Sequence, residues 1–129
     1  MAEQFEHEVV HAKLKVSQGG DTRKIKEEVN LLVAHGWRLD DEKMGLQTSF
    51  TFPTFVKAVE FMNKVFEESA HQNHHAGIYN MNRLVTVHWT TYRPRGLSAK
   101  DTKMAQWCHE QGPQLGGQYD TNISNGPNA

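Results

Sequence analysis

Two adjacent histidines, His74 and His75, lie just before a segment in which apolar and polar residues alternate. The unperturbed imidazole pKa of about 6.5 lets a histidine give or take a proton near neutral pH. A pair at the boundary of an element therefore suggests general acid–base catalysis. Taken alone, the dipeptide is better explained as part of a polar turn, so the surrounding sequence has to decide between the two interpretations.

A metal site is a further interpretation, because His71 and His75 are four residues apart and could share one face of a helix. No glutamate separates them in the H-E-x-x-H manner, and Cys108 is remote in the sequence. We therefore expect no metal ligands. Cys108 is better explained as a small buried hydrophobic side chain.

Length and charge limit the classes of protein. A chain of 129 residues has the size of one domain with one core. With 14 Lys and Arg against 15 Asp and Glu, the formal net charge is -1. A broad basic surface of the kind that binds nucleic acid directly is therefore not expected.

The single cysteine and the hydropathy pattern indicate where such a chain would work. One cysteine cannot form an internal disulfide, which fits a reducing compartment. We find no apolar run of signal-peptide length near the start and no run of about 20 apolar residues that would span a bilayer. We expect no membrane segment and a cytoplasmic location, with the nucleus as the alternative.

The histidine pair has to be positioned by the elements around it. Helical spacing of apolar residues predicts helices over 23–35, from Thr54 onward, and over 99–110. In the second helix the predicted core or interface stripe comprises Phe55, Ala58, Val59, Met62, Val65 and Phe66. Alternating residues predict strands over 37–39, 46–52, 77–82 and 85–91.

This α-β-β-α-β-β-α order predicts a single α+β domain, with a four-stranded antiparallel sheet covered by helices on one face. We assign residues 21–111 to this domain and residues 1–20 to an N-terminal arm or extra strand. Residues 112–129 are rich in Gly, Pro and small polar residues, so we predict a flexible tail there.

Several spaced motifs together resemble the pterin-4a-carbinolamine dehydratase family, which is also known for a member that helps a homeodomain transcription factor dimerise. The resemblance covers about residues 30–110. It is carried by Gly36-Trp37, Phe50-Thr51-Phe52, the helix with Phe61-Met62, His74-His75, Trp89-Thr90-Thr91, and Gly96-Leu97-Ser98 with Asp101.

The resemblance implies an α+β fold, assembly as a homodimer or homotetramer, and a pterin substrate without a metal or organic cofactor. The implied reaction removes water from 4a-hydroxytetrahydrobiopterin, giving the quinonoid dihydropterin in tetrahydrobiopterin recycling. His74 and His75 fall on the catalytic histidine pair, and Tyr92 falls on the position of a third histidine. The implied substrate-binding residues are Ala76, Thr91, Arg93, Pro94 and Trp37.

The chain departs from the family pattern at Ala70, Asn73, Ala76, Asn82 and Tyr92. Because tyrosine, with a pKa near 10, is a poor base at neutral pH, Tyr92 predicts slower turnover than a third histidine would give. We expect His71 to be the residue best placed to supply a replacement imidazole. The alternative is a non-catalytic or weakly catalytic scaffold that binds a protein partner.

Overall fold

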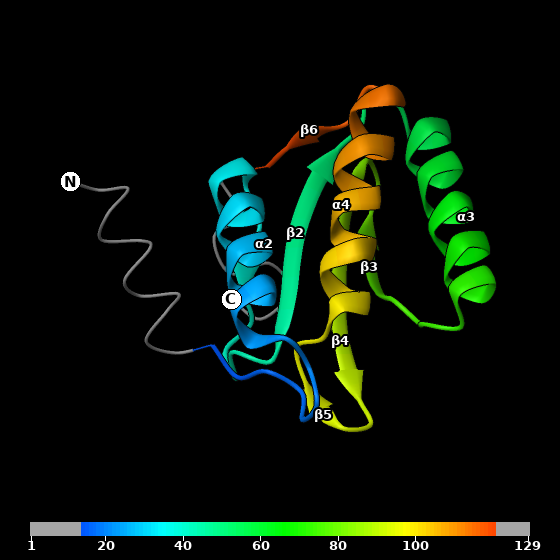
Figure 1. The fold of residues 1–129 in the computed structure, drawn as a ribbon. Helices are drawn as coiled ribbons and strands as arrows, with labels where there is room; N and C mark the ends of the chain where they lie inside the picture. The colour runs from blue at the N-terminus through cyan, green and yellow to red at the C-terminus, as the bar shows by residue number, and fades with distance from the viewer. Residues whose placement is uncertain (1–13, 121–129) are drawn as a thin grey trace.

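The computed structural model describes residues 14–120, which form a sheet with three helices on one face (Figure 1). The helices are α2 (Thr22–His35), α3 (Phe55–Gln72) and α4 (Ala99–Gln114). The strands are β1 (Arg38–Leu39), β2 (Gly45–Thr51), β3 (Gly77–Met81), β4 (Leu84–Tyr92), β5 (Arg95–Gly96) and β6 (Gln118–Tyr119). Residues 1–13 of the predicted arm and 121–129 of the predicted tail lie outside the described residues.

Each helix begins at a residue whose side chain accepts a hydrogen bond from a backbone amide of the first turn. Asp21 accepts from the Lys24 amide at 3.2 Å, and Thr54 accepts from the Lys57 amide at 3.1 Å. Ser98 begins α4 in a reciprocal capping box with Asp101. These caps satisfy amides that have no partner within the helix. The helix starts predicted from apolar spacing agree closely with the observed ones.

The sheet has the strand order β1-β2-β4-β3, with every pair antiparallel. The two long central strands, β2 and β4, are paired from Gly45↔Thr90 to Thr51↔Leu84. Two short strands extend this arrangement, because β6 pairs with β2 and β5 pairs with β4. The predicted α+β fold with an antiparallel sheet and helices on one face is thus confirmed.

The core lies between the sheet and the helices. Alternate residues of β4, Val85, Val87 and Trp89, are completely buried. Phe50 of β2 makes an edge contact with Phe61 of α3, with ring centroids 5.4 Å apart. Cys108 of α4 is buried in the same core, and burial raises the pKa of its thiol to about 12. It therefore behaves as the small apolar side chain that we predicted.

The buried face of α3 differs from the predicted stripe. Ala58, Phe61 and Val65 are fully buried, whereas Phe55 and Phe66 are each 51% exposed. The sequence predicted both phenylalanines in a core or interface stripe, and the structure shows that this chain alone does not bury them. The helix turns Phe61 toward the sheet instead, which leaves Phe55 and Phe66 at the margins of that face.

Residues 112–120 do not form the predicted tail. Helix α4 continues through Pro113 to Gln114, and Gln118–Tyr119 form β6 beside β2. A Cβ at Gly112 would lie 2.9 Å from the Phe50 ring, and one at Gly117 would lie 2.7 Å from the Phe52 ring. These glycines allow close packing against aromatic rings, and composition alone had suggested flexibility instead.

The described part of the N-terminal arm lies against the β5 end of the sheet. Val16 forms a parallel bridge with Leu97, and the Ser17 amide donates to the Leu97 carbonyl at 2.7 Å. The hydroxyl of Ser17 also donates to the Pro94 carbonyl at 2.7 Å. Residues 15–17 are thus joined to the residues around Leu97 by an isolated bridge, without forming a strand. None of the helices within residues 14–120 has the length and apolar character needed to cross a membrane.

Tyr119 fixes the end of the described chain to the domain. Its hydroxyl accepts a hydrogen bond from Nε1 of Trp37 at 2.9 Å and lies 2.7 Å from Nδ1 of His109. Its ring lies against Phe50, with centroids 4.6 Å apart. Burial raises the pKa of Tyr119 to about 12, so the hydroxyl remains protonated at neutral pH.

We predict that Tyr119→Phe lowers the free energy of unfolding by about 1–3 kcal/mol, because the buried Trp37 N–H loses its partner. Urea unfolding followed by tryptophan fluorescence measures this loss. Tyr79→Phe removes the same hydroxyl from a partly exposed residue and is the matched control. Equal effects of the two substitutions would contradict the role of Tyr119.

Burial, together with the neighbouring His35, lowers the pKa of His109. Below pH of about 6.5 the unfolded chain takes up a proton at this position that the folded chain resists. We therefore predict that the free energy of unfolding falls as the pH decreases from about 7.5 to 5.5. In the His109→Gln variant, the free energy of unfolding, measured by urea unfolding, should change less over this pH range. If the variant shows the same dependence on pH as the wild type, the role assigned to His109 is wrong.

Candidate active site

The end of α3 sets the position of the histidine pair. Asn73 adopts a left-handed conformation with φ 51 and ψ 43, which ends the helix after Gln72. The amide of His74 then donates to the Ser69 carbonyl at 3.0 Å. Asparagine adopts the left-handed conformation more readily than most residues. An asparagine at position 73 therefore allows the chain to turn away from the helix axis there. Because the helix ends here, His71 and His74 do not share a helix face.

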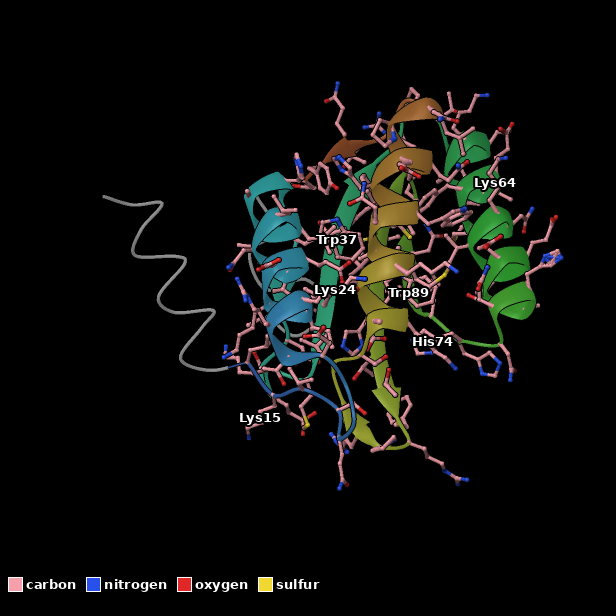
Figure 2. The ribbon with its side chains drawn as sticks, in the orientation of Figure 1. Lys15, Lys24, Trp37, Lys64, His74 and Trp89 are labelled. Carbon is pink, nitrogen blue, oxygen red and sulfur yellow. The ribbon has the colours of Figure 1, made fainter. Side chains whose placement is uncertain are left out.

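His74 lies in the protein interior against β4. Its ring stacks on Trp89, with centroids 5.8 Å apart and an angle of 12° between the planes, and the residue is only 8% exposed. Nε2 of His74 lies 2.6 Å from Oδ1 of Asp101. Figure 2 shows His74 and Trp89 near one another, whereas Trp37 lies apart from them between α2 and α4.

The carboxylate of Asp101 joins three elements. It is completely buried, and its Oδ2 accepts hydrogen bonds from the Ser98 amide at 3.0 Å and from Oγ1 of Thr91 at 2.8 Å. A carboxylate that already accepts from two donors also receives the Nε2 proton of His74, which leaves Nδ1 without a proton in the neutral ring. The network assigns this tautomer.

The other predicted site residues lie nearer to solvent. His75 follows the turn and is exposed, and Tyr92 at the end of β4 is 69% exposed. Arg93 and Pro94 are exposed in the turn between β4 and β5, and the peptide bond that joins them is cis. Ala76 is half-buried next to the histidine pair, and Thr91 is half-buried at the carboxylate.

The structure thus connects some predicted residues and separates others. His74 and Thr91 meet at Asp101, so the two segments predicted to form the site do contact each other. Trp37 is 2% exposed and donates its N–H to Tyr119 in the core, so it offers no surface to a ligand. Within residues 14–120, no group of three or more His, Cys, Asp or Glu side chains is arranged to hold a metal ion.

Sequence reasoning missed the contact of Asp101 with the histidine. Ser98 and Asp101 form a capping box, in which Oδ2 of Asp101 accepts from the Ser98 amide. The other oxygen of the same carboxylate binds His74, which is 27 residues away in the chain. Acidic residues are seldom fully buried unless they are paired, so the burial of Asp101 would have indicated a partner. That burial is seen in the structure and could not be read from the sequence.

The arrangement is suited to proton transfer. One imidazole is held by a buried carboxylate in a single orientation and tautomer, as in His–carboxylate pairs that act as general bases. A second imidazole, His75, is the next residue and is open to solvent. A phenol, that of Tyr92, follows Thr91 and can donate a hydrogen bond.

The fold and this buried His–Asp pair define a small α+β protein with a candidate acid–base site at one end of its sheet. The chain matches the family model described as "Pterin 4 alpha carbinolamine dehydratase" over residues 20–111. It belongs to that family.

Relatives agree with this assignment. A protein of Cupriavidus pinatubonensis named "Putative pterin-4-alpha-carbinolamine dehydratase 1" is 37% identical over 78 residues, which is 60% of this chain and 67% of that protein. A Prochlorococcus marinus protein named "Putative pterin-4-alpha-carbinolamine dehydratase" is 38% identical over 71 residues, which is 55% of this chain and 72% of that protein.

The fold also matches a solved structure, the "transcriptional coactivator/pterin dehydratase" from Brucella melitensis. The two are 27% identical with a TM-score of 0.60, and the match covers 65% of this chain and 92% of that one.

We predict that Asp101→Asn lowers the free energy of unfolding by about 2 kcal/mol or more, since hydrogen bonds to a buried charge are lost or weakened. It should also abolish the downfield proton signal of the His74 Nε2–H in NMR spectra. Asp21→Asn makes the same change at the exposed cap of α2, where asparagine caps as well as aspartate, and is the control. Equal losses at both positions would show that Asp101 acts only as a cap.

Proposed function

We propose that this protein dehydrates a 4a-hydroxytetrahydropterin to the quinonoid dihydropterin. In this reaction the bond from C4a to the hydroxyl oxygen breaks, the hydroxyl leaves as water after protonation, and N5 loses its proton as the C4a=N5 double bond forms. The step needs one acid and one base near each other and no redox partner. Membership of the dehydratase family supports the substrate class.

The single observation that carries the proposal is the His74–Asp101 hydrogen bond of 2.6 Å at the point where the ends of α3 and β4 meet. A buried carboxylate fixes the imidazole before substrate binds, which lowers the cost of reorganisation in the transition state. In the proposal, His74 and His75 exchange protons with the pterin. His75, being exposed, contacts the substrate from the solvent side.

Tyr92 takes the third position in this proposal. Its phenol donates a hydrogen bond to the departing hydroxyl but is a weak base at neutral pH. Thr91 holds the carboxylate, while Ala76, Arg93 and Pro94 border the pterin. Because one positioned acid or base contributes about 10²–10⁴-fold, we propose that the enzyme is slower than one with a histidine at position 92.

A second candidate function rests on the exposed apolar face of α3. Phe55 and Phe66 are 51% exposed and Val56 is 64% exposed, which is unusual for large apolar side chains on one helix. These residues favour assembly with another copy or with a protein partner. A scaffold of this kind could act without catalysis, so the two functions are separated by an activity measurement.

The test is a stopped assay of 4a-hydroxytetrahydropterin dehydration, in which we expect wild type to exceed the uncatalysed rate. We predict that His75→Ala lowers kcat by about 10²–10⁴-fold and that Tyr92→His raises it. His35→Gln, on an exposed position of α2, is the matched control and should leave the rate unchanged.

The remaining outcomes are informative in different ways. A wild-type rate equal to the uncatalysed rate would favour the scaffold function. If Tyr92→His is slower than wild type, the tyrosine is the adapted residue and takes part in proton transfer. If His71→Ala is as slow as His75→Ala, the third imidazole comes from His71.

A further inference from the structure

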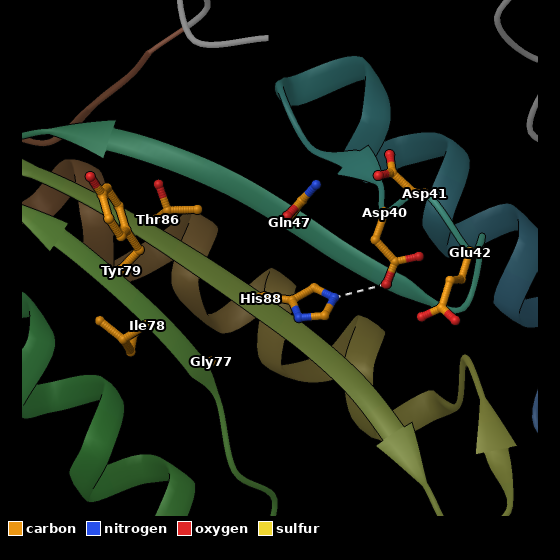
Figure 3. A pocket seen from close by; sticks show the side chains of 9 residues that line it. All are labelled: Asp40, Asp41, Glu42, Gln47, Gly77, Ile78, Tyr79, Thr86 and His88. Atoms are coloured by element: carbon orange, nitrogen blue, oxygen red, sulfur yellow. Dashed lines mark hydrogen bonds and ion pairs between the residues drawn. The ribbon is translucent and has the colours of Figure 1, made fainter. Parts of the chain in front are cut away.

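A concavity lies on the face of the sheet opposite the helices (Figure 3). It has a volume of about 530 Å³, which is within the range of sites for small molecules. Its floor is formed by β2, β3 and β4, and one wall is formed by the turn after β1. His88 belongs to this face, whereas the next residue, Trp89, faces the core and stacks on His74. The two sites therefore lie on opposite sides of β4.

A His–Asp pair marks the end of this concavity. Nε2 of His88 lies 2.8 Å from Oδ2 of Asp40, and Figure 3 shows both side chains above the strands. Gly45 makes room for the pair, because a Cβ there would clash with both partners. Burial raises the pKa of Asp40, but hydrogen bonds from His88 and from backbone amides outweigh it and lower the pKa. The carboxylate is therefore ionised at neutral pH.

Gln47 on the floor of the concavity lacks a partner. The residue is only 6% exposed, yet its side chain lines the concavity and no described residue hydrogen bonds to the amide. The amide faces the concavity, so its oxygen is available to a ligand that offers an N–H.

The charge of the residues that line the concavity indicates which kind of ligand it would bind. Three of the nine lining residues are carboxylates, Asp40, Asp41 and Glu42, and none is Lys or Arg. Glu42 is paired with Arg95 through two contacts of 2.8 and 2.9 Å, and Asp40 is paired with His88. Asp41 is exposed and has no partner among the described residues. Arg38 is the cross-strand partner of Gln47 on the same sheet face, but it does not line the concavity. The lining itself is acidic, which favours a cation over an anion.

We propose that this concavity binds small planar organic cations of the amidinium or guanidinium class. Asp41 supplies the opposite charge, and the oxygen of Gln47 accepts an N–H. Nδ1 of His88, left as an acceptor when Nε2 donates to Asp40, is available for a second N–H. The part of the sheet around Gly77 and Tyr79 receives the planar part of the ligand.

The experiment uses three ligands of the same shape on the full chain: benzamidinium, neutral benzamide and anionic benzoate. Binding is followed by NMR of the backbone amides and of the Gln47 side-chain amide. We expect saturable shifts around Gln47, Gly77 and His88 with benzamidinium, at a Kd at least about tenfold lower than that for benzamide. Benzoate should bind more weakly still.

Variants locate the binding. Gln47→Leu keeps the size of the side chain and should raise the Kd for benzamidinium about tenfold. Asp41→Asn, at an exposed position without a partner, should raise it about twofold to fivefold. The control is Glu67→Gln on exposed α3, which should leave the Kd unchanged. If Gln47→Leu loses its dispersed spectrum, Asp41→Asn decides the question.

Three results would overturn the proposal. One is equal binding of the three ligands, which would indicate apolar contact without charge recognition. Another is a set of shifts confined to residues around His74 and Tyr92, which would place the ligand in the candidate active site. The third is the absence of any saturable shift with benzamidinium. None of these outcomes depends on dehydratase activity, so the two proposals fail separately.

Discussion

The buried carboxylate of Asp101 is the contact on which the candidate active site depends. A charge without exposure is costly unless hydrogen bonds replace water, and here three different segments supply the donors. The end of α3 provides His74, the end of β4 provides Thr91, and the start of α4 provides the Ser98 amide. Moving any one of these segments would leave the charge undersatisfied. The site geometry is thus fixed by the same contacts that stabilise the fold.

The alternation of side chains along β4 separates two kinds of chemistry. Trp89 faces the helices and supports the His74 ring, while His88 faces the opposite side and pairs with Asp40. Because neighbouring residues of a strand point to opposite faces, a shift of one residue in the β2–β4 register would exchange their surroundings. The register from Gly45↔Thr90 onward is therefore as important to both sites as the side chains themselves.

Local patterns in the sequence predicted most elements, and contacts between distant residues explain the failures. Helical spacing of apolar residues located the helices, and alternation located β2 and β4. The glycine content around Gly112 and Gly117 predicted a flexible tail. In the structure these glycines pack against Phe50 and Phe52, a contact that composition cannot reveal. The His74–Asp101 bond was not predictable for a similar reason. It depends on the direction in which the chain leaves α3, which the left-handed Asn73 determines.

Burial also explains where this chain differs from the family pattern that it resembles. The departures at Ala70, Asn73, Asn82 and Tyr92 all lie on exposed residues, and Ala76 is half-buried. His74, Trp89 and Asp101 are buried and keep the pattern. A change at a buried member of the network leaves a charge or ring without its partner, whereas a change at an exposed position costs little stability. The same buried frame can therefore hold different solvent-facing acids and bases, and in the proposed function position 92 is one of these exposed positions.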